Sequence, residues 1–223
     1  MTWKTRLPLL AESVIPLSLC GALMDHVKSE TARPRTFQGV VDETLRKSEY
    51  VEIPTALEEA VISHCVPYIR DHFQAVPKRI PTQPAVVYRY GPGVGFVAHH
   101  DEVTDIERER ARTNGQPVVG GDLTLLVWLN TPDSYSGGEL FFENPAQEIK
   151  PPCGTLVAFP ATRDHIHGVR PITRGERITL VIRTDAESLE GRRTAAIAVL
   201  KGDDPLVLGM AGTPRPRSSP SVG

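Results

Sequence analysis

The sequence is poor in cysteine, in aromatic residues and in net charge. Its 223 residues include three cysteines, 6% aromatic residues and a formal net charge of −2. Three cysteines without C-x-x-C spacing argue against a disulfide framework or a zinc ribbon. A charge so close to balance gives no reason to expect a nucleic-acid or membrane-surface partner. The length suffices for one hydrophobic core, so we expect one catalytic domain in a reducing cytoplasm.

Long uninterrupted hydrophobic runs are also missing. An apolar stretch over residues 7–24 follows Lys4 and Arg6, as it would in a secretory signal, but Glu12 and two prolines break it. A signal peptide needs an unbroken apolar region, and a membrane-spanning helix needs about 20 apolar residues. We therefore expect neither a secretory leader nor a spanning helix.

Helical patterns come first in the chain, and strand patterns follow. Apolar spacing predicts helices over about residues 18–29, with Ser18 as N-cap, and 55–74, where Thr55-Ala56-Leu57-Glu58 resembles a capping box and Pro67 should kink or interrupt the helix. The predicted strands are 84–90, 94–101, 122–130, 138–143, 154–159 and 176–184. Short strands after leading helices indicate an all-β sandwich or barrel with flanking helices, an α+β arrangement.

The segment Phe96-Val97-Ala98-His99-His100-Asp101 contains the first candidate metal ligands. Residues two apart on a strand share a face, so His99 and Asp101 can point together while His100 points away. One imidazole and one carboxylate supply two ligands of the facial triad that suits non-haem iron(II). The ordinary alternative is a surface histidine beside a turn aspartate, because H-x-D is common by chance.

A further histidine and an arginine lie later in the chain. His167 is followed ten residues on by Arg177, which opens an apolar run. Arg177, Thr179 and Val181 would share a strand face, and an arginine on a buried face is costly unless it is paired. A guanidinium matches a carboxylate in bidentate fashion. Its partner is then either a bound dicarboxylate or an internal Asp or Glu.

Together these motifs resemble the prolyl-4-hydroxylase-like branch of the iron(II)/2-oxoglutarate-dependent dioxygenases. The matching motifs are Tyr90-Gly91-Pro92-Gly93, His99-His100-Asp101, Tyr135-Ser136-Gly137-Gly138-Glu139-Leu140 and the stretch from His167 to Arg177. The resemblance implies a double-stranded β-helix, a cupin-like jelly roll. We expect a single oxygenase domain over residues 1–210, with a helical part over 1–80, a β-helix core over about 84–184 and a disordered tail over 211–223.

The resemblance also implies which residues form the site. His99, Asp101 and His167 would hold iron(II) at the catalytic centre. The residues assigned to the co-substrate 2-oxoglutarate are Arg177, on its distal carboxylate, with Thr179, Tyr90 and Trp128, the last of which stands where relatives can carry a tyrosine. His165 shares a face with His167 but lacks the ten-residue offset to Arg177. We therefore expect it to lie beside the metal ligands, to face the substrate or to serve only in packing.

The implied reaction uses iron(II), 2-oxoglutarate and oxygen, with ascorbate as an accessory reductant, and yields succinate and carbon dioxide. We expect hydroxylation of an unactivated C–H bond, in a prolyl-like amino-acid side chain that is free or part of a peptide or protein. Related halogenases have Ala or Gly in place of Asp101, so this carboxylate argues against halogenation. The alternatives are tailoring of a small secondary metabolite, a cupin-like binding module without turnover, and an interaction protein whose charged segment 102–119 binds partners. That segment would otherwise be a solvated loop or a lid over the site.

Overall fold

The computed structural model describes residues 3–34, 48–115 and 120–190. The chain divides after Glu187 into two compact units, and the first unit, which carries all the predicted site residues, is described below. Its described residues form three sheets, three α-helices and two short 3₁₀ helices, Trp3–Thr5 and Pro132–Ser134. The predicted tail over residues 211–223 lies outside the described residues.

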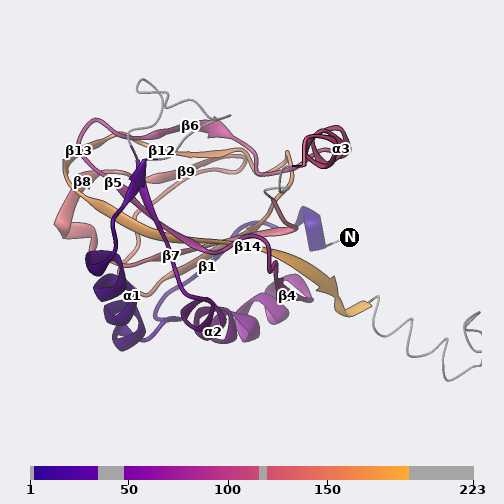
Figure 1. Ribbon diagram of the computed structural model, residues 1–223, viewed down its shortest axis with the longest axis horizontal. Coiled ribbons are helices and arrows are strands. Elements are labelled where there is room, and N and C mark those ends of the chain that lie inside the picture. The colour runs from indigo at the N-terminus through magenta and orange to yellow at the C-terminus, as the bar shows by residue number, and fades with distance from the viewer. Residues whose placement is uncertain (1–2, 35–47, 116–119, 191–223) are drawn as a thin grey trace, which may run out of the picture. The chain divides into compact units, whose positions relative to one another are not determined.

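An eight-stranded sheet forms the larger layer (Figure 1). Its strands are, in spatial order, β1 (Leu9–Ala11), β11 (Leu156–Pro160), β7 (Leu123–Trp128), β14 (Arg177–Ser188), β5 (Val86–Tyr90), β3 (Glu49–Glu52) and β2 (Arg33–Pro34), with β4 (Ala75–Arg79) also paired to β14. The ladders from β1 to β2 are antiparallel. The predicted segments 84–90, 122–130, 154–159 and 176–184 all contribute central strands of this sheet.

A four-stranded antiparallel sheet faces the larger one. It comprises β10 (Ala146–Ile149), β9 (Leu140–Glu143), β12 (His167–Val169) and β6 (Phe96–His99), and a separate pair is formed by β13 (Ile172–Gly175) and β8 (Tyr135–Gly137). Apolar side chains from β7, β11, β9 and β10 pack together between the layers; they are Leu126, Trp128, Leu140, Phe142, Ile149, Val157 and Phe159. Two facing antiparallel sheets confirm the predicted double-stranded β-helix.

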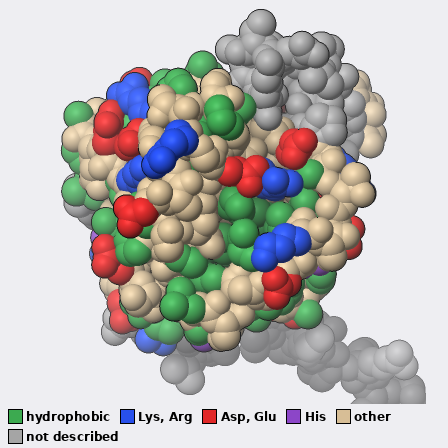
Figure 2. Space-filling model, turned by 90° about the vertical axis from the view of Figure 1, so that its left-hand side faces the viewer, with side chains coloured by type: hydrophobic (Ala, Val, Ile, Leu, Met, Phe, Trp, Pro, Cys, Tyr) green, Lys and Arg blue, Asp and Glu red, His purple; other side chains and the backbone are tan. Residues whose placement is uncertain are grey.

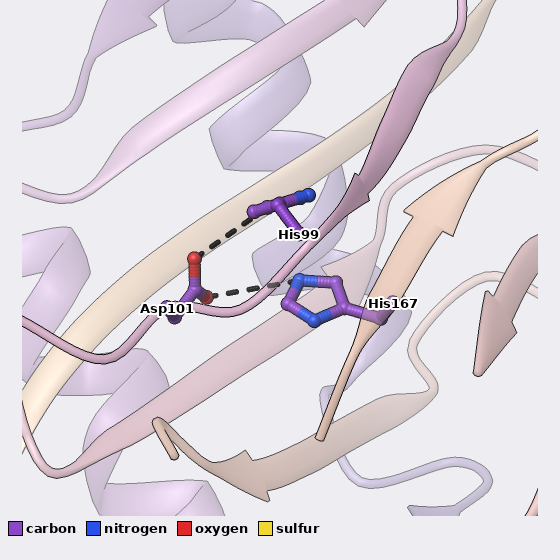
Figure 3. Close-up of side chains that lie close together, drawn as sticks. All are labelled: His99, Asp101 and His167. Carbon is purple, nitrogen blue, oxygen red and sulfur yellow. Dashed lines mark ion pairs between the residues drawn. The ribbon is translucent and has the colours of Figure 1, made fainter. Parts of the chain in front are cut away.

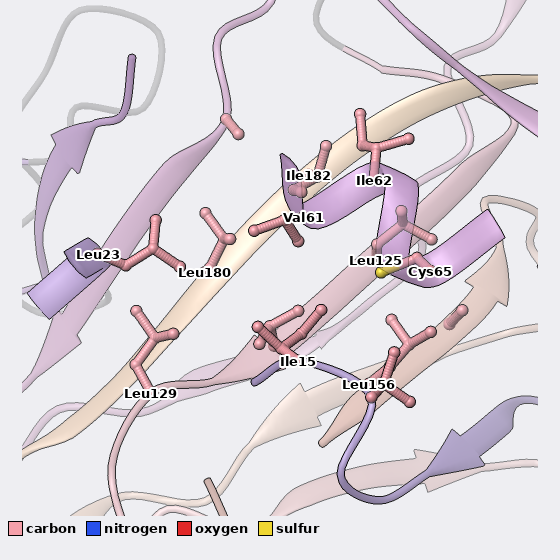
Figure 4. Close-up of a cluster of buried hydrophobic side chains, with 14 of the residues drawn as sticks. Ile15, Leu23, Val61, Ile62, Cys65, Leu125, Leu129, Leu156, Leu180 and Ile182 are labelled. Atoms are coloured by element: carbon pink, nitrogen blue, oxygen red, sulfur yellow. The ribbon is translucent and has the colours of Figure 1, made fainter. Parts of the chain in front are cut away.

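The two central strands of the large sheet, β7 along its length and β14 over its first four residues, are buried on both faces. On β14, Ile178, Leu180 and Ile182 belong to the core on the helical side, and β7 contributes alternate residues to the same core (Figure 4). The residues between them on β14 therefore point towards the small sheet, because successive side chains on a strand alternate. This alternation places Arg177 and Thr179 inside the β-helix, as the sequence predicted.

Two helices cover the outer face of the large sheet (Figure 1), at positions close to those predicted. They are α1 (Leu17–Ser29) and α2 (Thr55–Phe73). The predicted caps are wrong: Pro16 and Pro54 occupy the N-cap positions, and neither helix has a side-chain cap. Arg79 instead donates hydrogen bonds to Thr55 and to the buried Glu58, so tertiary contacts use both groups of the expected capping box.

The expected interruption at Pro67 does not occur, since α2 continues to Phe73. Pro67 is exposed on the outer side of the helix. Water can reach a carbonyl there that has lost its helical partner, so the proline costs less than it would on the buried side.

The charged segment after Asp101 contains a helix that the sequence analysis did not predict. Helix α3 (Asp105–Thr113) begins at a capping box in which Thr104 and Glu107 satisfy each other's backbone N–H groups, and none of its residues is buried. The capping pattern was present in the sequence. The segment has no apolar stripe of the kind that marks a helix packed on a core.

The described surface carries mixed charge. On the face drawn in Figure 2, hydrophobic side chains line a hollow, and basic and acidic side chains alternate around it. All three cysteines are free. Among the described residues, no helix combines the length and the apolar composition needed to cross a lipid bilayer.

Candidate active site

Three predicted ligands meet between the two sheets (Figure 3). His99 ends β6, His167 begins β12, and the two are direct partners in the antiparallel ladder. Asp101 follows β6 by two residues, and the candidate ligand atoms of all three side chains lie within 4.8 Å of one another. His99 Nε2 is 3.6 Å from one carboxylate oxygen of Asp101, and His167 Nε2 is 3.8 Å from the other.

Backbone carbonyls orient both imidazoles. His99 Nδ1 lies 2.9 Å from the carbonyl of Val97, and His167 Nδ1 lies 2.9 Å from that of His165. A carbonyl only accepts, so each Nδ1 carries the proton and each Nε2 keeps its lone pair directed towards Asp101. Two imidazole nitrogens and one carboxylate oxygen form a donor set that fits a non-haem iron(II) ion.

The charge states of the triad suit a cation. Burial alone would raise the pKa of Asp101, but the Arg183 guanidinium, with the neighbouring His99 and His167 and the hydrogen bond from Thr124, holds that pKa well below its usual range. Burial lowers the pKa of His167 to about 4, against the opposing charge of Asp101. At neutral pH the carboxyl is therefore ionised and His167 is neutral, the states in which both can bind a metal.

These shifts predict acid sensitivity of the metal-free protein. Between pH 6.5 and about 4 the unfolded chain takes up a proton at His167 that the folded protein does not, so the free energy of unfolding should fall as the pH drops through this range. Asp101 adds a further loss at still lower pH, because its pKa is depressed on folding. Urea unfolding at a series of pH values measures the effect. His167→Gln should flatten the slope above pH 4, whereas the control His64→Gln, exposed on α2, should not; an unchanged slope in His167→Gln would contradict this account.

Arg177 is buried without a counter-ion. It is 2% exposed, and its guanidinium carbon lies 4.8 Å from the ring centre of Trp128 and 5.3 Å from that of Tyr90. In the part of the chain that the structure describes, no carboxylate forms an ion pair with it, and both its Nε and the hydroxyl of Thr179 lack hydrogen-bond partners. Burial lowers the pKa of Arg177, and the Tyr90 and Tyr135 hydroxyls oppose that shift only in part. Among the described residues Arg177 thus has no Asp or Glu partner, which favours a bound carboxylate.

One pocket connects the triad to Arg177. Its charged and polar lining consists of the triad with Tyr88, Tyr90, Thr124, Arg177, Thr179 and Arg183. Its apolar lining comes from Phe96, Leu126, Leu140, Val169 and Val181. A ligand in this pocket can therefore touch the candidate metal ligands at one point and the Arg177 guanidinium at another.

Trp128 is the one predicted co-substrate residue that the structure does not bring to this pocket. Its side chain is fully buried behind Arg177, and its indole N–H donates to the Tyr135 hydroxyl at 3.2 Å. The Trp128 ring packs against the Arg177 guanidinium and not against the pocket.

Tyr135 and Gly138 explain the Tyr-Ser-Gly-Gly motif. A Cβ atom on Gly138, which has a φ of +72°, would lie 3.0 Å from the Tyr135 ring and 3.3 Å from the Arg177 side chain. Glycine therefore lets both side chains pack closely. The sequence showed the motif but not that Tyr135 meets Arg177.

His100 and His165, which lie close in sequence to the candidate ligands, take no part in the metal-ligating cluster. His100 is exposed and does not line the pocket. Both ring nitrogens of His165 are engaged, Nδ1 by the Thr162 hydroxyl and Nε2 by the Arg6 carbonyl, each at 2.9 Å. Neither histidine belongs to the metal-ligating cluster formed by the described residues.

Arg183 and Thr124 were not predicted as site residues. Arg183 forms an ion pair with Asp101, and Thr124 donates a hydrogen bond to the same carboxylate. The sequence did contain a signal for Arg183, because the alternation that places Arg177 and Thr179 on one face of β14 extends to position 183. No comparable signal marked Thr124.

Comparison with known proteins agrees with this geometry. Residues 85–182 match the 2OG-Fe(II) oxygenase superfamily. A PKHD-type hydroxylase of Xanthomonas campestris is 36% identical over 121 residues, which is 51% of this chain and 50% of the relative. One from Gluconacetobacter diazotrophicus is 37% identical over 107 residues, 47% and 43% of the two chains. The chain thus spans about half the length of the curated relatives it matches.

Solved structures show the same fold at low sequence identity. A Pseudomonas putida prolyl-4-hydroxylase superimposes with a TM-score of 0.58 at 17% identity, over 80% of this chain and 94% of that one. A Trichoplax adhaerens prolyl hydroxylase, in complex with a hypoxia inducible factor peptide fragment, has a TM-score of 0.59 at 17% identity, over 81% and 84%.

Proposed function

We propose that this chain, whose residues 85–182 match the 2OG-Fe(II) oxygenase superfamily, is an iron(II)- and 2-oxoglutarate-dependent dioxygenase. It hydroxylates an unactivated C–H bond of an amino-acid side chain and releases succinate and carbon dioxide. One observation carries the proposal: a His-Asp-His cluster and a buried guanidinium without a counter-ion open into the same pocket.

The residues divide into two groups by what they bind. His99, Asp101 and His167 would hold iron(II), which when bound supplies the activation of oxygen. Arg177 takes the distal carboxylate of 2-oxoglutarate, and the unpartnered hydroxyl of Thr179 has a hydrogen bond to offer the same group. A carboxylate bound at Arg177 would form charge-assisted hydrogen bonds with the guanidinium, in place of the water that burial has removed.

The surroundings of Arg177 prepare it to bind that carboxylate. The rings of Trp128 and Tyr90 lie against the guanidinium and restrict where it can move. The apolar pocket walls exclude water, which strengthens the electrostatic attraction between a guanidinium and a carboxylate. Both effects favour a dicarboxylate that reaches from the metal to Arg177.

The substrate we propose is a prolyl-like side chain, free or in a peptide or protein. Support comes from the PKHD-type hydroxylases that this chain resembles and from the structural neighbour in complex with a peptide fragment. The free cysteines agree with a reducing compartment, and we place the protein in the cytoplasm.

Turnover with a substrate panel tests the proposed function. The protein is incubated with iron(II), 2-oxoglutarate, ascorbate and isotopically labelled oxygen gas, together with proline, other free amino acids and prolyl peptides. We expect one substrate to gain a single labelled oxygen atom, with one succinate formed per product, as measured by mass spectrometry. Binding of iron and 2-oxoglutarate without succinate formation for any substrate would favour a binding module instead.

A further inference from the structure

The carboxylate of Asp101 is held on both oxygens by two side chains. Thr124 Oγ1 donates to Oδ2 at 2.7 Å, and Arg183 lies 2.9 Å from Oδ2 through Nη1 and donates to Oδ1 through Nη2 at 3.0 Å. The Asp101 side chain is only 5% exposed, so water competes little for these positions.

The pairing of β7 with β14 builds this arrangement. Thr124 and Arg183 are direct partners across the antiparallel ladder, so their side chains emerge on the same face of the sheet. Both line the pocket, and the Arg183 side chain is 20% exposed there. The two groups therefore reach Asp101 together, from paired positions on adjacent strands of the sheet.

The number of contacts limits what Asp101 can offer a cation. An ionised carboxylate has about four lone-pair positions, two on each oxygen. Thr124 fills one position on Oδ2 and Arg183 fills one on Oδ1 by hydrogen bonds, and Arg183 Nη1 also lies 2.9 Å from Oδ2 as an ion-pair partner. Oδ2 therefore has two partners and Oδ1 has one, so Oδ1, which lies 3.6 Å from His99 Nε2, is the more open oxygen.

We propose that Arg183 and Thr124 are positioning residues that restrict Asp101 to binding iron(II) through Oδ1 alone. This inference rests on the proposed function. A facial triad needs the remaining metal positions open for co-substrate and oxygen. A carboxylate free to bind through both oxygens would occupy one of them. The two residues thus protect 2-oxoglutarate binding, and they do not strengthen iron binding, since the positive charge of Arg183 opposes a cation beside it.

Three variants separate this role from a general effect of charge. Arg183→Met removes a charge, the hydrogen bond to Oδ1 and the ion-pair contact with Oδ2. Thr124→Val removes the hydrogen bond to Oδ2 without changing charge, and Arg183→Lys keeps the charge but not the two-pronged contact. The metal-free proteins are titrated with iron(II) under anaerobic conditions. They are then titrated with 2-oxoglutarate, whose binding to the iron is followed by visible charge-transfer absorption.

In Arg183→Met we expect the Kd for 2-oxoglutarate to rise about 10- to 100-fold, the range typical of residues that support metal ligands, while the Kd for iron(II) stays equal or falls. Thr124→Val should raise the Kd for 2-oxoglutarate a few-fold. The Kd of Arg183→Lys should lie between those of Arg183→Met and the unchanged protein. The matched control is Arg89→Met. Arg89 is a part-buried arginine that pairs with Glu176 outside the pocket, and its loss should change neither constant.

Several results would overturn the proposal. Weaker iron binding with unchanged 2-oxoglutarate binding would mean that the two residues only hold Asp101 in place. If Arg183→Lys bound 2-oxoglutarate as well as the unchanged protein and Thr124→Val had no effect, the positive charge at position 183 would explain the result by itself. Thermal unfolding checks the fold of each variant, and Thr124→Val carries the test should Arg183→Met not fold. If the unchanged protein with iron(II) shows no charge-transfer absorption on adding 2-oxoglutarate, the proposed function itself fails. If the absorption appears with the same Kd in the unchanged protein and in all variants, only this inference is contradicted.

Discussion

Replacing His99, Asp101 or His167 by alanine is expected to abolish iron-dependent succinate formation in each case. Each side chain supplies one of the three protein donors that converge within 4.8 Å. A cation held by two of them would lose both affinity and a fixed orientation. Succinate formation and bound iron should be measured together, with circular dichroism as a check that each variant is folded.

His100→Ala is the matched control for these variants. It removes a histidine from the same segment, but that side chain is exposed and outside the pocket, so turnover should persist. His165→Ala should likewise keep its iron, because both ring nitrogens of His165 are engaged by Thr162 and Arg6. If His165→Ala lost succinate formation while His167→Ala retained it, the ligand assignment would be wrong.

Arg177→Met is expected to raise the KM for 2-oxoglutarate by about two orders of magnitude. Losing a charge-assisted contact in a buried pocket costs about 2–5 kcal/mol, and about 1.4 kcal/mol corresponds to a factor of ten. Methionine fills much of the space between Trp128 and Tyr90, so the change removes mainly the charge and the hydrogen bonds. Arg177→Lys should lose less, because the charge remains without the planar fork.

Iron(II) affinity distinguishes this effect from a loss of structure. Arg177 is not among the metal ligands, so Arg177→Met should bind iron(II) normally in the absence of 2-oxoglutarate. Arg89→Met serves again as control, since its loss removes a part-buried arginine from the neighbouring strand and should leave the KM unchanged. An unchanged KM in Arg177→Met would indicate that the buried arginine serves the fold and not the co-substrate.

Much of the site could be predicted because it depends on local periodicity. The two-residue repeat of strands places Arg177 and Thr179 on one face, and the structure has them there, both lining the pocket. The order of motifs indicated which strands carry the ligands. The two covering helices were also predictable, since apolar spacing over many residues is a strong signal. Strands of three or four residues, such as β1 and β3, carry too little pattern to stand out.

The contacts that tune the site were decided only by the tertiary structure. Thr124 meets Arg183 through the register between β7 and β14, and both meet Asp101, which comes from a segment that pairs with the other sheet. Tyr135 lies only seven residues after Trp128, to which it is hydrogen-bonded, but it also meets Arg177 from a distant part of the sequence. Each of these contacts depends on which strand pairs with which and in what register. Alternation along one strand determines the face that a side chain occupies, but only the pairing of strands determines what that side chain meets.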